Sequence, residues 1–434
     1  MRTKLLQVGV EELEYEIRDI VKKAEKMEAI GTEISWENIG DPIQKNAKIP
    51  GWIKDIVSEL VREDTSYGYT HSKGERTTRE FLAQWTNNKE GTKITADDIL
   101  FFNGLGDAIH KVYQYLDPTS RVIGPSPAYS THSSAEAAHA NKVPLTYTLD
   151  PDNHWYPDVD DLRSKVRYNP NIVGILIINP DNPTGMVLPK ETFEEIVAIA
   201  KEYDLFLVCD EIYNLITYNG AHAYSLSEVI GDVPGIAMKG ISKEVPWPGS
   251  RCGWMEFYNR DKDPEFDRLC NTLEDAKMIE VCSTTLPQKA IPKILGDERY
   301  MPYRMALNDQ IGSRSKVITS ILSELPQLRF NETFGAFYNT IVFKEGVLKP
   351  GQSLAIESEE AKQLAESWVN DDMDLDKRFV YYLLAAKGVC VVPLSSFHSE
   401  LKGFRVTLLE ENEELLRSTF TKIKDAVIEF CGSV

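Results

Sequence analysis

The feature that most constrains this chain is the alternation of short apolar runs with helical patterns from about residue 52 onward. Helices are predicted over 53–63 and 77–85, and strands over 98–102, 120–124, 143–148, 172–178, 205–209 and 235–238. Several runs, such as Ile172–Ile178, are apolar throughout, which is typical of a parallel strand covered on both faces. The alternation therefore predicts an α/β fold with a largely parallel sheet.

The pattern changes after about residue 300. A long helix is predicted over 303–325, and short strands and a final helix follow within 334–343, 387–393 and 404–430. The acidic stretch 357–376 between them is predicted to be a solvated helix and loop. We therefore expect a large α/β domain over residues 53–300. A smaller α+β domain would combine residues 1–52 with 301–434.

Composition and charge exclude several classes of partner and location. Asp and Glu total 67 against 48 Lys and Arg, so a formal charge of −19 argues against nucleic acid or an anionic membrane as the main partner. The longest apolar run is far short of the ~20 residues that span a bilayer, and charge breaks the N-terminus before a signal-peptide core forms. Six scattered cysteines without a CxxC pair favour reduced thiols, no metal site and a cytoplasmic location.

Two segments place polar residues directly after predicted strands. The segment Asn179–Gly185, which reads NPDNPTG, follows the apolar run that ends at Ile178. The next strand leads into Asp210 and Tyr213, within the sequence DEIY. In open α/β sheets, ligands bind at the carboxyl ends of strands, so these positions are candidates for a site. Taken alone, Asp210 is better explained as the N-cap of a following helix.

Two more segments complete a constellation. Gly240–Lys243 follows the strand predicted at 235–238, and the motif Gly249–Trp254, which contains Arg251, comes soon after. A single lysine after a strand is usually solvated. The four segments together, in this order and spacing, point to one shared site.

These motifs resemble those of the class I/II aminotransferase family of fold-type I pyridoxal-phosphate (PLP) enzymes, and the resemblance covers nearly the whole chain. It implies that Lys243 forms a Schiff base with the cofactor and, once released by the substrate, moves the proton between Cα and C4′. Asp210 would pair with the pyridine nitrogen, while Tyr213 and Asn182 would hydrogen-bond the ring hydroxyl. This role suits Asp210 because the cofactor accepts electrons only while its ring nitrogen stays protonated.

The resemblance also assigns a phosphate site. Arg251 and Ser242 would bind the phosphate, together with main-chain amides of Gly104, Leu105 and Gly106, which open a predicted helix. A guanidinium and the N–H groups at a helix start both suit a dianion. Arg251 would further help to keep the lysine amine neutral. Family members often carry a hydroxyl at the position of Gly240, so phosphate binding here would depend more on the remaining groups.

Two side chains after the strand at 120–124 extend the resemblance. The position of Tyr129 holds an aromatic ring that stacks on the pyridine face in the family. His132 resembles the histidine that supports the ring-nitrogen aspartate in aspartate-aminotransferase-like members. A surface position on a helix is the alternative for His132.

The resemblance places substrate binding between the two domains. Arg405, within Gly403–Thr407, would bind the substrate α-carboxylate through a guanidinium fork. The backbone of Gly40 would approach the same carboxylate, alongside Asn182, so that substrate draws the domains together. Tyr69 would reach the cofactor phosphate of a neighbouring subunit, which implies a homodimer with shared active sites.

The resulting expectation is a PLP-dependent aminotransferase with a ping-pong cycle between an amino acid and a 2-oxo acid. A PLP-dependent lyase or decarboxylase on the same fold is the alternative enzyme. A ligand-sensing domain of a regulator would need an attached DNA-binding module, which the acidic N-terminal segment does not supply. Neither the amino-acid donor nor the oxo-acid acceptor can be read from the sequence.

Overall fold

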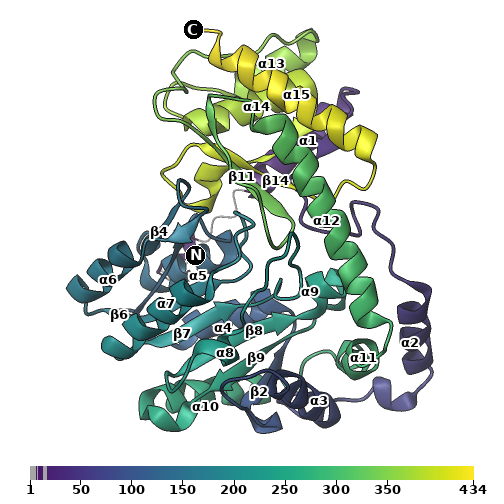
Figure 1. The fold of residues 1–434 in the computed structure, drawn as a ribbon, viewed down its shortest axis with the longest axis vertical. Coiled ribbons are helices and arrows are strands. Elements are labelled where there is room, and N and C mark those ends of the chain that lie inside the picture. The colour runs from purple at the N-terminus through teal and green to yellow at the C-terminus, as the bar shows by residue number, and fades with distance from the viewer. Residues whose placement is uncertain (1–5, 7, 13–16) are drawn as a thin grey trace.

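The computed structural model describes residues 6, 8–12 and 17–434. Within these residues, a large sheet with its helices occupies one half of the molecule, and a smaller sheet with α13, α14 and α15 occupies the other (Figure 1). The long helix α12 (Tyr300–Leu322) runs along both halves. No helix in this described part of the chain is long and apolar enough to cross a membrane.

The large sheet has eight strands in the order β2-β9-β8-β7-β6-β3-β4-β5. Their bounds are β2 Ile99–Phe102, β3 Arg121–Ser126, β4 Thr146–Asp150, β5 Tyr156–Pro157, β6 Ile172–Ile178, β7 Phe206–Asp210, β8 Gly235–Gly240 and β9 Gly253–Tyr258. Pairings from β4 through β8 are parallel, and only β9 and β5 run against their neighbours. The expected α/β fold with a mostly parallel sheet is confirmed.

Strand β9 was not expected from the sequence. Its residues Gly253–Tyr258 place a buried glutamate, Glu256, in the middle of an otherwise apolar run. The carboxylate is paired with Lys239 of the neighbouring strand β8, at 2.9 Å. A search for apolar runs misses such a strand, because the charged Glu256 interrupts the run. Its partner Lys239 lies on another strand, so the pairing of the two charges cannot be read from either run alone.

Both faces of the sheet are covered, as the continuous apolar runs predicted. Along β6, Ile175 and Ile177 join the core that includes residues of α6, α7 and α11. The alternate residues Leu176 and Ile178 join the core with residues of α4, α5 and α10. The helices of this half are α2 Gly51–Val61, α3 Arg76–Asn87, α4 Leu105–Tyr115, α5 Ser130–Ala140, α6 Val159–Tyr168, α7 Lys190–Glu202, α8 Leu226–Val229, α9 Ile241–Glu244, α10 Pro264–Ile279 and α11 Thr285–Leu295. Of these, α2, α3 and α4 were expected by residue range from the sequence.

The smaller half joins the beginning and the end of the chain. Its four-stranded sheet has the order β10-β11-β14-β13, with bounds β10 Leu328–Arg329, β11 Tyr338–Phe343, β14 Gly403–Thr407 and β13 Val392–Pro393. Strand β1 (Ser35–Trp36) pairs in parallel with β12 (Val389–Cys390). This pairing joins an N-terminal strand to a C-terminal one, as a small domain built from residues 1–52 and 301–434 requires. The boundaries at residues 52 and 300 stay a prediction.

The remaining helices pack around these strands. They are α1 Ile17–Ala29, α13 Glu359–Trp368, α14 Leu375–Lys387 and α15 Glu413–Cys431, with short 3₁₀ turns at 10–12, 64–66, 96–98, 248–250, 260–262 and 394–397. The apolar spacing over residues 11–29 is helical and predicts a helix there, and residues 13–16 of that range lie outside the described residues. Helix α13 occupies the acidic stretch and buries only small residues, Ala361 and Ala365, while its acidic side chains face solvent.

Candidate active site

The predicted site residues of the large sheet gather at one edge. The turn at 179–185 follows β6, Asp210 ends β7, and α9 with Lys243 follows β8. The register pairs Ile178 with Asp210 and Asp210 with Met238, so these strand ends lie side by side. The carboxyl ends of parallel strands are where open α/β sheets bind ligands.

Asp210 is a buried carboxylate held from two sides. Its Oδ2 lies 3.1 Å from Nε2 of His132, and its Oδ1 accepts a hydrogen bond from the N–H of Ile212 at 3.1 Å. A turn follows Asp210 instead of a helix, so the N-cap interpretation is wrong. His132 is 1% exposed, so its alternative surface position is also wrong. The pair supplies a fixed negative charge that an imidazole orients.

Lys243 reaches across to the N-terminal segment of the chain. Its Nζ donates a hydrogen bond to the carbonyl oxygen of Gly40 at 2.6 Å. The lysine side chain also borders a narrow cavity of about 60 Å³, together with Phe337 and Arg304. The structure therefore brings together Gly40 and Lys243, which lie 203 positions apart in the sequence.

Arg405 lies on β14, which puts it on the opposite side of the site from the large sheet. Its Nη1 donates to Oδ1 of Asn182 at 3.3 Å and its Nη2 to the carbonyl oxygen of Asn38 at 2.6 Å. The guanidinium also lies against the rings of Tyr338 and Phe397, at 4.5 and 5.1 Å from their centroids. Its Nε has no hydrogen-bond partner within the described residues. A buried guanidinium without a carboxylate partner suits a carboxylate ligand.

Tyr213 lies in the turn after Asp210 and is buried. Its hydroxyl is 3.1 Å from the hydroxyl of Tyr338. Burial, together with the neighbouring Tyr338, raises the pKa of Tyr213 well above its ordinary value. The residue therefore stays a neutral phenol that can donate a hydrogen bond.

The predicted phosphate-binding segments also meet. A Cβ atom placed on Gly104 would lie 2.3 Å from Nη2 of Arg251, so the guanidinium packs directly on this turn. Gly104 has φ +86°, which a side chain rarely adopts, and α4 begins at the next residue, Leu105. Space is open above Gly106, and Ser242 is half-buried beside Lys243. A helix start and a guanidinium are groups that suit an anion.

Two predicted aromatic residues have different surroundings. Tyr129 is half-buried at the start of α5, edge-on to His132 with ring centroids 6.4 Å apart. Tyr69 is 85% exposed, with Tyr67 beside it 74% exposed. The structure therefore brings Tyr129 to the site and leaves Tyr69 on the surface.

Sequence reasoning missed several residues of the site. Tyr338 and Phe397 flank Arg405, Asn38 contributes its carbonyl, and Asp181 in the NPDNPTG turn is buried. The strand predicted within 334–343 contained Tyr338, but nothing in its pattern separated a site residue from a core residue. The pairing of β11 with β14, which is a long-range contact, is what brings Tyr338 to Arg405.

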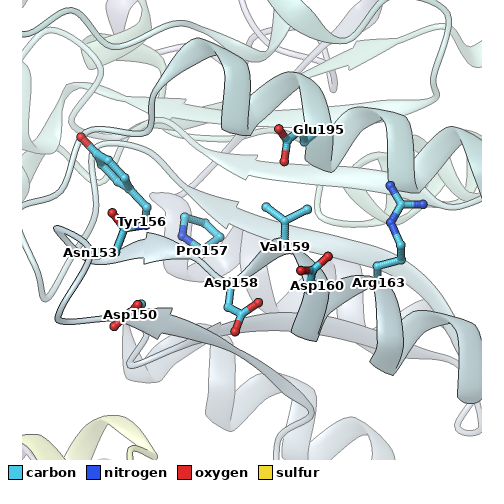
Figure 2. Close-up of a pocket in the computed structure, with 9 residues that line it drawn as sticks. All are labelled: Asp150, Asn153, Tyr156, Pro157, Asp158, Val159, Asp160, Arg163 and Glu195. Carbon is cyan, nitrogen blue, oxygen red and sulfur yellow. The ribbon is translucent and has the colours of Figure 1, made fainter.

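A second hollow lies away from these residues, around the start of α6 (Figure 2). It has a volume of about 380 Å³, and acidic side chains line much of it, including Asp158 and Asp150. Asp158 caps α6 by accepting from the N–H of Asp161 at 2.9 Å, and Asp150 accepts from the N–H of Asp152 at 2.8 Å. These two carboxylates serve local turns, and the hollow is separate from the site around Lys243.

Comparison with known proteins places the chain. The family model for aminotransferase class I and II matches residues 38–418. The chain is 54% identical over 430 residues, 99% of each chain, to an uncharacterized aminotransferase of Methanocaldococcus jannaschii. It is 29% identical over 327 residues to the glutamate-pyruvate aminotransferase AlaA of Escherichia coli, covering 75% of this chain and 79% of that relative.

Solved structures agree with this comparison. The alanine aminotransferase of Pyrococcus furiosus matches with a TM-score of 0.84 at 28% identity, covering 98% of this chain and 100% of that one. An aspartate aminotransferase of Thermus thermophilus, with a TM-score of 0.80 at 22% identity, shares the fold. The chain belongs to the class I and II aminotransferase family and is a PLP-dependent aminotransferase of fold type I.

Proposed function

We propose that this aminotransferase moves the amino group between alanine and glutamate, with pyruvate and 2-oxoglutarate as the matching oxo acids. The observation that carries a role in α-amino acid chemistry is the buried guanidinium of Arg405, which faces the same segment as Lys243. Arg405 bonds to the carbonyl of Asn38 and Lys243 to that of Gly40. One substrate can thus place its carboxylate and its amino carbon at these two groups. The names of the relatives support the choice of alanine and glutamate.

The residues at the sheet edge fit pyridoxal 5′-phosphate. Asp210 would hold the ring nitrogen, since within the described residues its buried carboxylate is bonded only to His132 and one backbone N–H. The helix start at Leu105, with Arg251 packed on Gly104, would hold the phosphate. When bound, the cofactor supplies a carbonyl for the amino group and a ring that accepts electrons from the substrate Cα.

The protein's own groups then have separable roles. Arg405 and Asn182 would bind and orient the substrate carboxylate, and Tyr213 would donate a hydrogen bond to the cofactor ring oxygen. The amine of Lys243, which would hold the cofactor between cycles, would take the proton from the substrate Cα and deliver it to the cofactor carbon C4′. The carbonyl of Gly40 accepts from that amine and keeps it close to the reacting carbon.

We also propose a homodimer with shared sites in the cytoplasm. Exposed apolar side chains occur in the segment that contains Tyr69 and at the end of α10: Tyr67, Met278, Ile279 and Val281 are 48–85% exposed. Thr285 donates to the carbonyl of Gly68 at 2.7 Å, which ties this segment to the start of α11. Apolar residues gathered on a surface indicate a protein interface. All six cysteines are free, which supports a reducing compartment.

A substrate panel tests the proposed function. Twenty amino acids are assayed as donors, each with 2-oxoglutarate and with pyruvate, and the new amino acid is quantified. We expect alanine with 2-oxoglutarate, and glutamate with pyruvate, to give the highest kcat/KM. Lys243→Ala, as the matched control, should give no turnover. The choice of alanine and glutamate is wrong if another donor exceeds both by more than tenfold.

A further inference from the structure

Tyr338 contacts three parts of the site that the function uses separately. Its ring lies under the guanidinium of Arg405, 4.5 Å from centroid to Cζ. Its hydroxyl is 3.1 Å from the hydroxyl of Tyr213. A Cβ atom on Gly40 would lie 2.1 Å from the same hydroxyl oxygen, so the backbone that holds Lys243 packs against it. Tyr338 itself is 2% exposed and starts strand β11.

The two buried hydroxyls form one hydrogen bond, in which either oxygen can be the donor. The direction of this bond decides whether Tyr213 can also donate to the cofactor. If Tyr213 donates to Tyr338, its hydrogen is not available to the cofactor. If Tyr338 donates to Tyr213, the hydrogen of Tyr213 is free to point at the cofactor ring oxygen. A hydroxyl that accepts one hydrogen bond also becomes a stronger donor in the next, because hydrogen bonds in a chain polarise one another.

The cation over the ring favours donation by Tyr338. A guanidinium above an aromatic face attracts its electron density, which makes the phenolic hydrogen of Tyr338 more positive. Arg405 has no carboxylate partner within the described residues, so this attraction is undiminished until a substrate carboxylate arrives. The arriving carboxylate offsets the cation and weakens the donation.

We propose that Tyr338 is a positioning residue. It donates a hydrogen bond to the hydroxyl of Tyr213, so that the hydrogen of Tyr213 points to the cofactor ring oxygen. When a substrate carboxylate binds Arg405, the donation by Tyr338 weakens, and the hydrogen bond from Tyr213 to the ring oxygen weakens with it. This inference rests on the proposed roles of Tyr213 and Arg405. It adds a residue that no comparison with relatives assigns and that contacts neither the cofactor nor the substrate in the proposed arrangement.

The test is an absorbance titration of the purified, cofactor-loaded enzyme. The bound cofactor changes colour when the nitrogen that joins it to Lys243 loses its proton, and the midpoint pH of that change is measured. Tyr338→Phe keeps the ring and removes only the hydroxyl. The ring oxygen's negative charge should then be less stabilised, the nitrogen should keep its proton longer, and the midpoint should rise by about half a unit to one unit.

Two further measurements, with a carboxylate probe and with a double variant, show whether the shift of the midpoint depends on the hydrogen bond between Tyr338 and Tyr213. Propionate, which carries a carboxylate but no amino group, should raise the midpoint of the wild type and change that of Tyr338→Phe by less than half as much. In a Tyr213→Phe background, adding Tyr338→Phe should cause no further shift. The matched control is Tyr218→Phe, whose hydroxyl bonds Thr333 and the carbonyl of Gly335 instead, and it should leave the midpoint unchanged.

The outcomes distinguish this inference from the function on which it rests. An unchanged midpoint in Tyr338→Phe, or an equal shift in both backgrounds, would overturn the role of Tyr338 while leaving the aminotransferase reaction intact. A protein that binds no coloured cofactor in any variant would instead contradict the proposed function itself.

Discussion

Arg405 and Asn182 show how a single buried contact joins distant parts of the chain. They are separated by 223 positions, and a hydrogen bond of 3.3 Å connects them. The other polar partner of Arg405, the carbonyl of Asn38, is also neutral, so no carboxylate within the described residues offsets the charge of the guanidinium. The fork shape of the guanidinium, and not its charge alone, should therefore decide how well a substrate is used.

Arg405→Lys tests that requirement. A lysine keeps the charge but cannot form two parallel hydrogen bonds, and a charge-assisted bond typically contributes ~1.5–3 kcal/mol. We expect kcat/KM for alanine to fall by about 10- to 150-fold, while cofactor affinity by absorbance titration changes by less than about twofold. An equal loss of cofactor affinity would mean that Arg405 supports the fold of the site instead.

Asp181, beside Asn182, is buried and forms no ion pair within the described residues, so the expected effect of replacing it is different. Burial raises the pKa of Asp181 to about 7, although Thr184 donates to its Oδ2, and the charge of Asp210 adds to the rise. A carboxyl group whose pKa is raised in the folded state stabilises that state below its unfolded pKa of ~3.9. This contribution is lost as the pH rises through 7.

Asp181→Asn stays neutral at every pH. Relative to the wild type, its free energy of unfolding should therefore increase from pH 4 to pH 7 and stay level above, with a total change of at most ~4 kcal/mol. Urea unfolding of the cofactor-free protein at a series of pH values measures this difference. Asp152→Asn, on an exposed turn, should show no such trend. A difference for Asp181→Asn that does not vary with pH would contradict the raised pKa.

At the scale of elements, strands β7, β8 and β9 carry a buried ion network beneath the site. Lys239 of β8 lies between Glu256 of β9, at 2.9 Å, and Glu211, at 3.5 Å, which directly follows Asp210. Burial alone would lower the pKa of Lys239, but the two carboxylates raise it above its ordinary value. Thr86, Trp254 and Tyr258 donate further hydrogen bonds to Glu256. The network thus links the loop of Asp210 to the sheet.

Lys239→Met should leave two carboxylates buried without their cation. Removing one partner of a buried ion pair typically costs ~3–5 kcal/mol, whereas a surface pair contributes ~0–1 kcal/mol. We expect the free energy of unfolding to fall by ~3–5 kcal/mol in Lys239→Met. The matched control, Lys201→Met, removes the exposed partner of Asp232 and should cost less than ~1 kcal/mol. Equal effects of the two changes would show that the network contributes little.

The elements also show what the sequence could and could not predict. It was predictable that polar site residues follow the ends of the parallel strands, because NPDNPTG, DEIY and the lysine segment each follow an apolar run. Strand β9 and the role of Tyr338 were not, since Glu256 is compensated by Lys239 and Tyr338 meets Arg405 only through the β11–β14 pairing. Local patterns reveal which residues end a strand. They do not reveal which side chains a distant strand brings beside them.

At the scale of the whole molecule, the site lies between the two halves of the chain. The large sheet supplies Asp210 and Lys243, while the smaller half supplies Arg405 and the segment with Gly40. Tyr69 is not in this chain's own site and is 85% exposed. The proposed dimer would complete the site by bringing this side chain to the neighbouring subunit's phosphate.

Mixed dimers test that arrangement. Lys243→Ala lacks the lysine, and Tyr69→Phe should bind the cofactor less tightly because the phosphate loses one hydrogen bond. When the two variants are mixed as verified heterodimers, one site per dimer should combine the native lysine and the native tyrosine, and its cofactor affinity should match the wild type. If heterodimers bind cofactor no better than Tyr69→Phe alone, Tyr69 does not serve the partner subunit.

The central claim is that Lys243 holds the cofactor and moves the substrate proton. Reduction of the cofactor-loaded enzyme with borohydride fixes the cofactor to the amine that carries it, and mass spectrometry of a digest then identifies that residue. The added mass is expected on Lys243 and on no other lysine, and Lys243→Ala should show no label although it still folds. A label on any lysine other than Lys243 in the wild type would contradict the account.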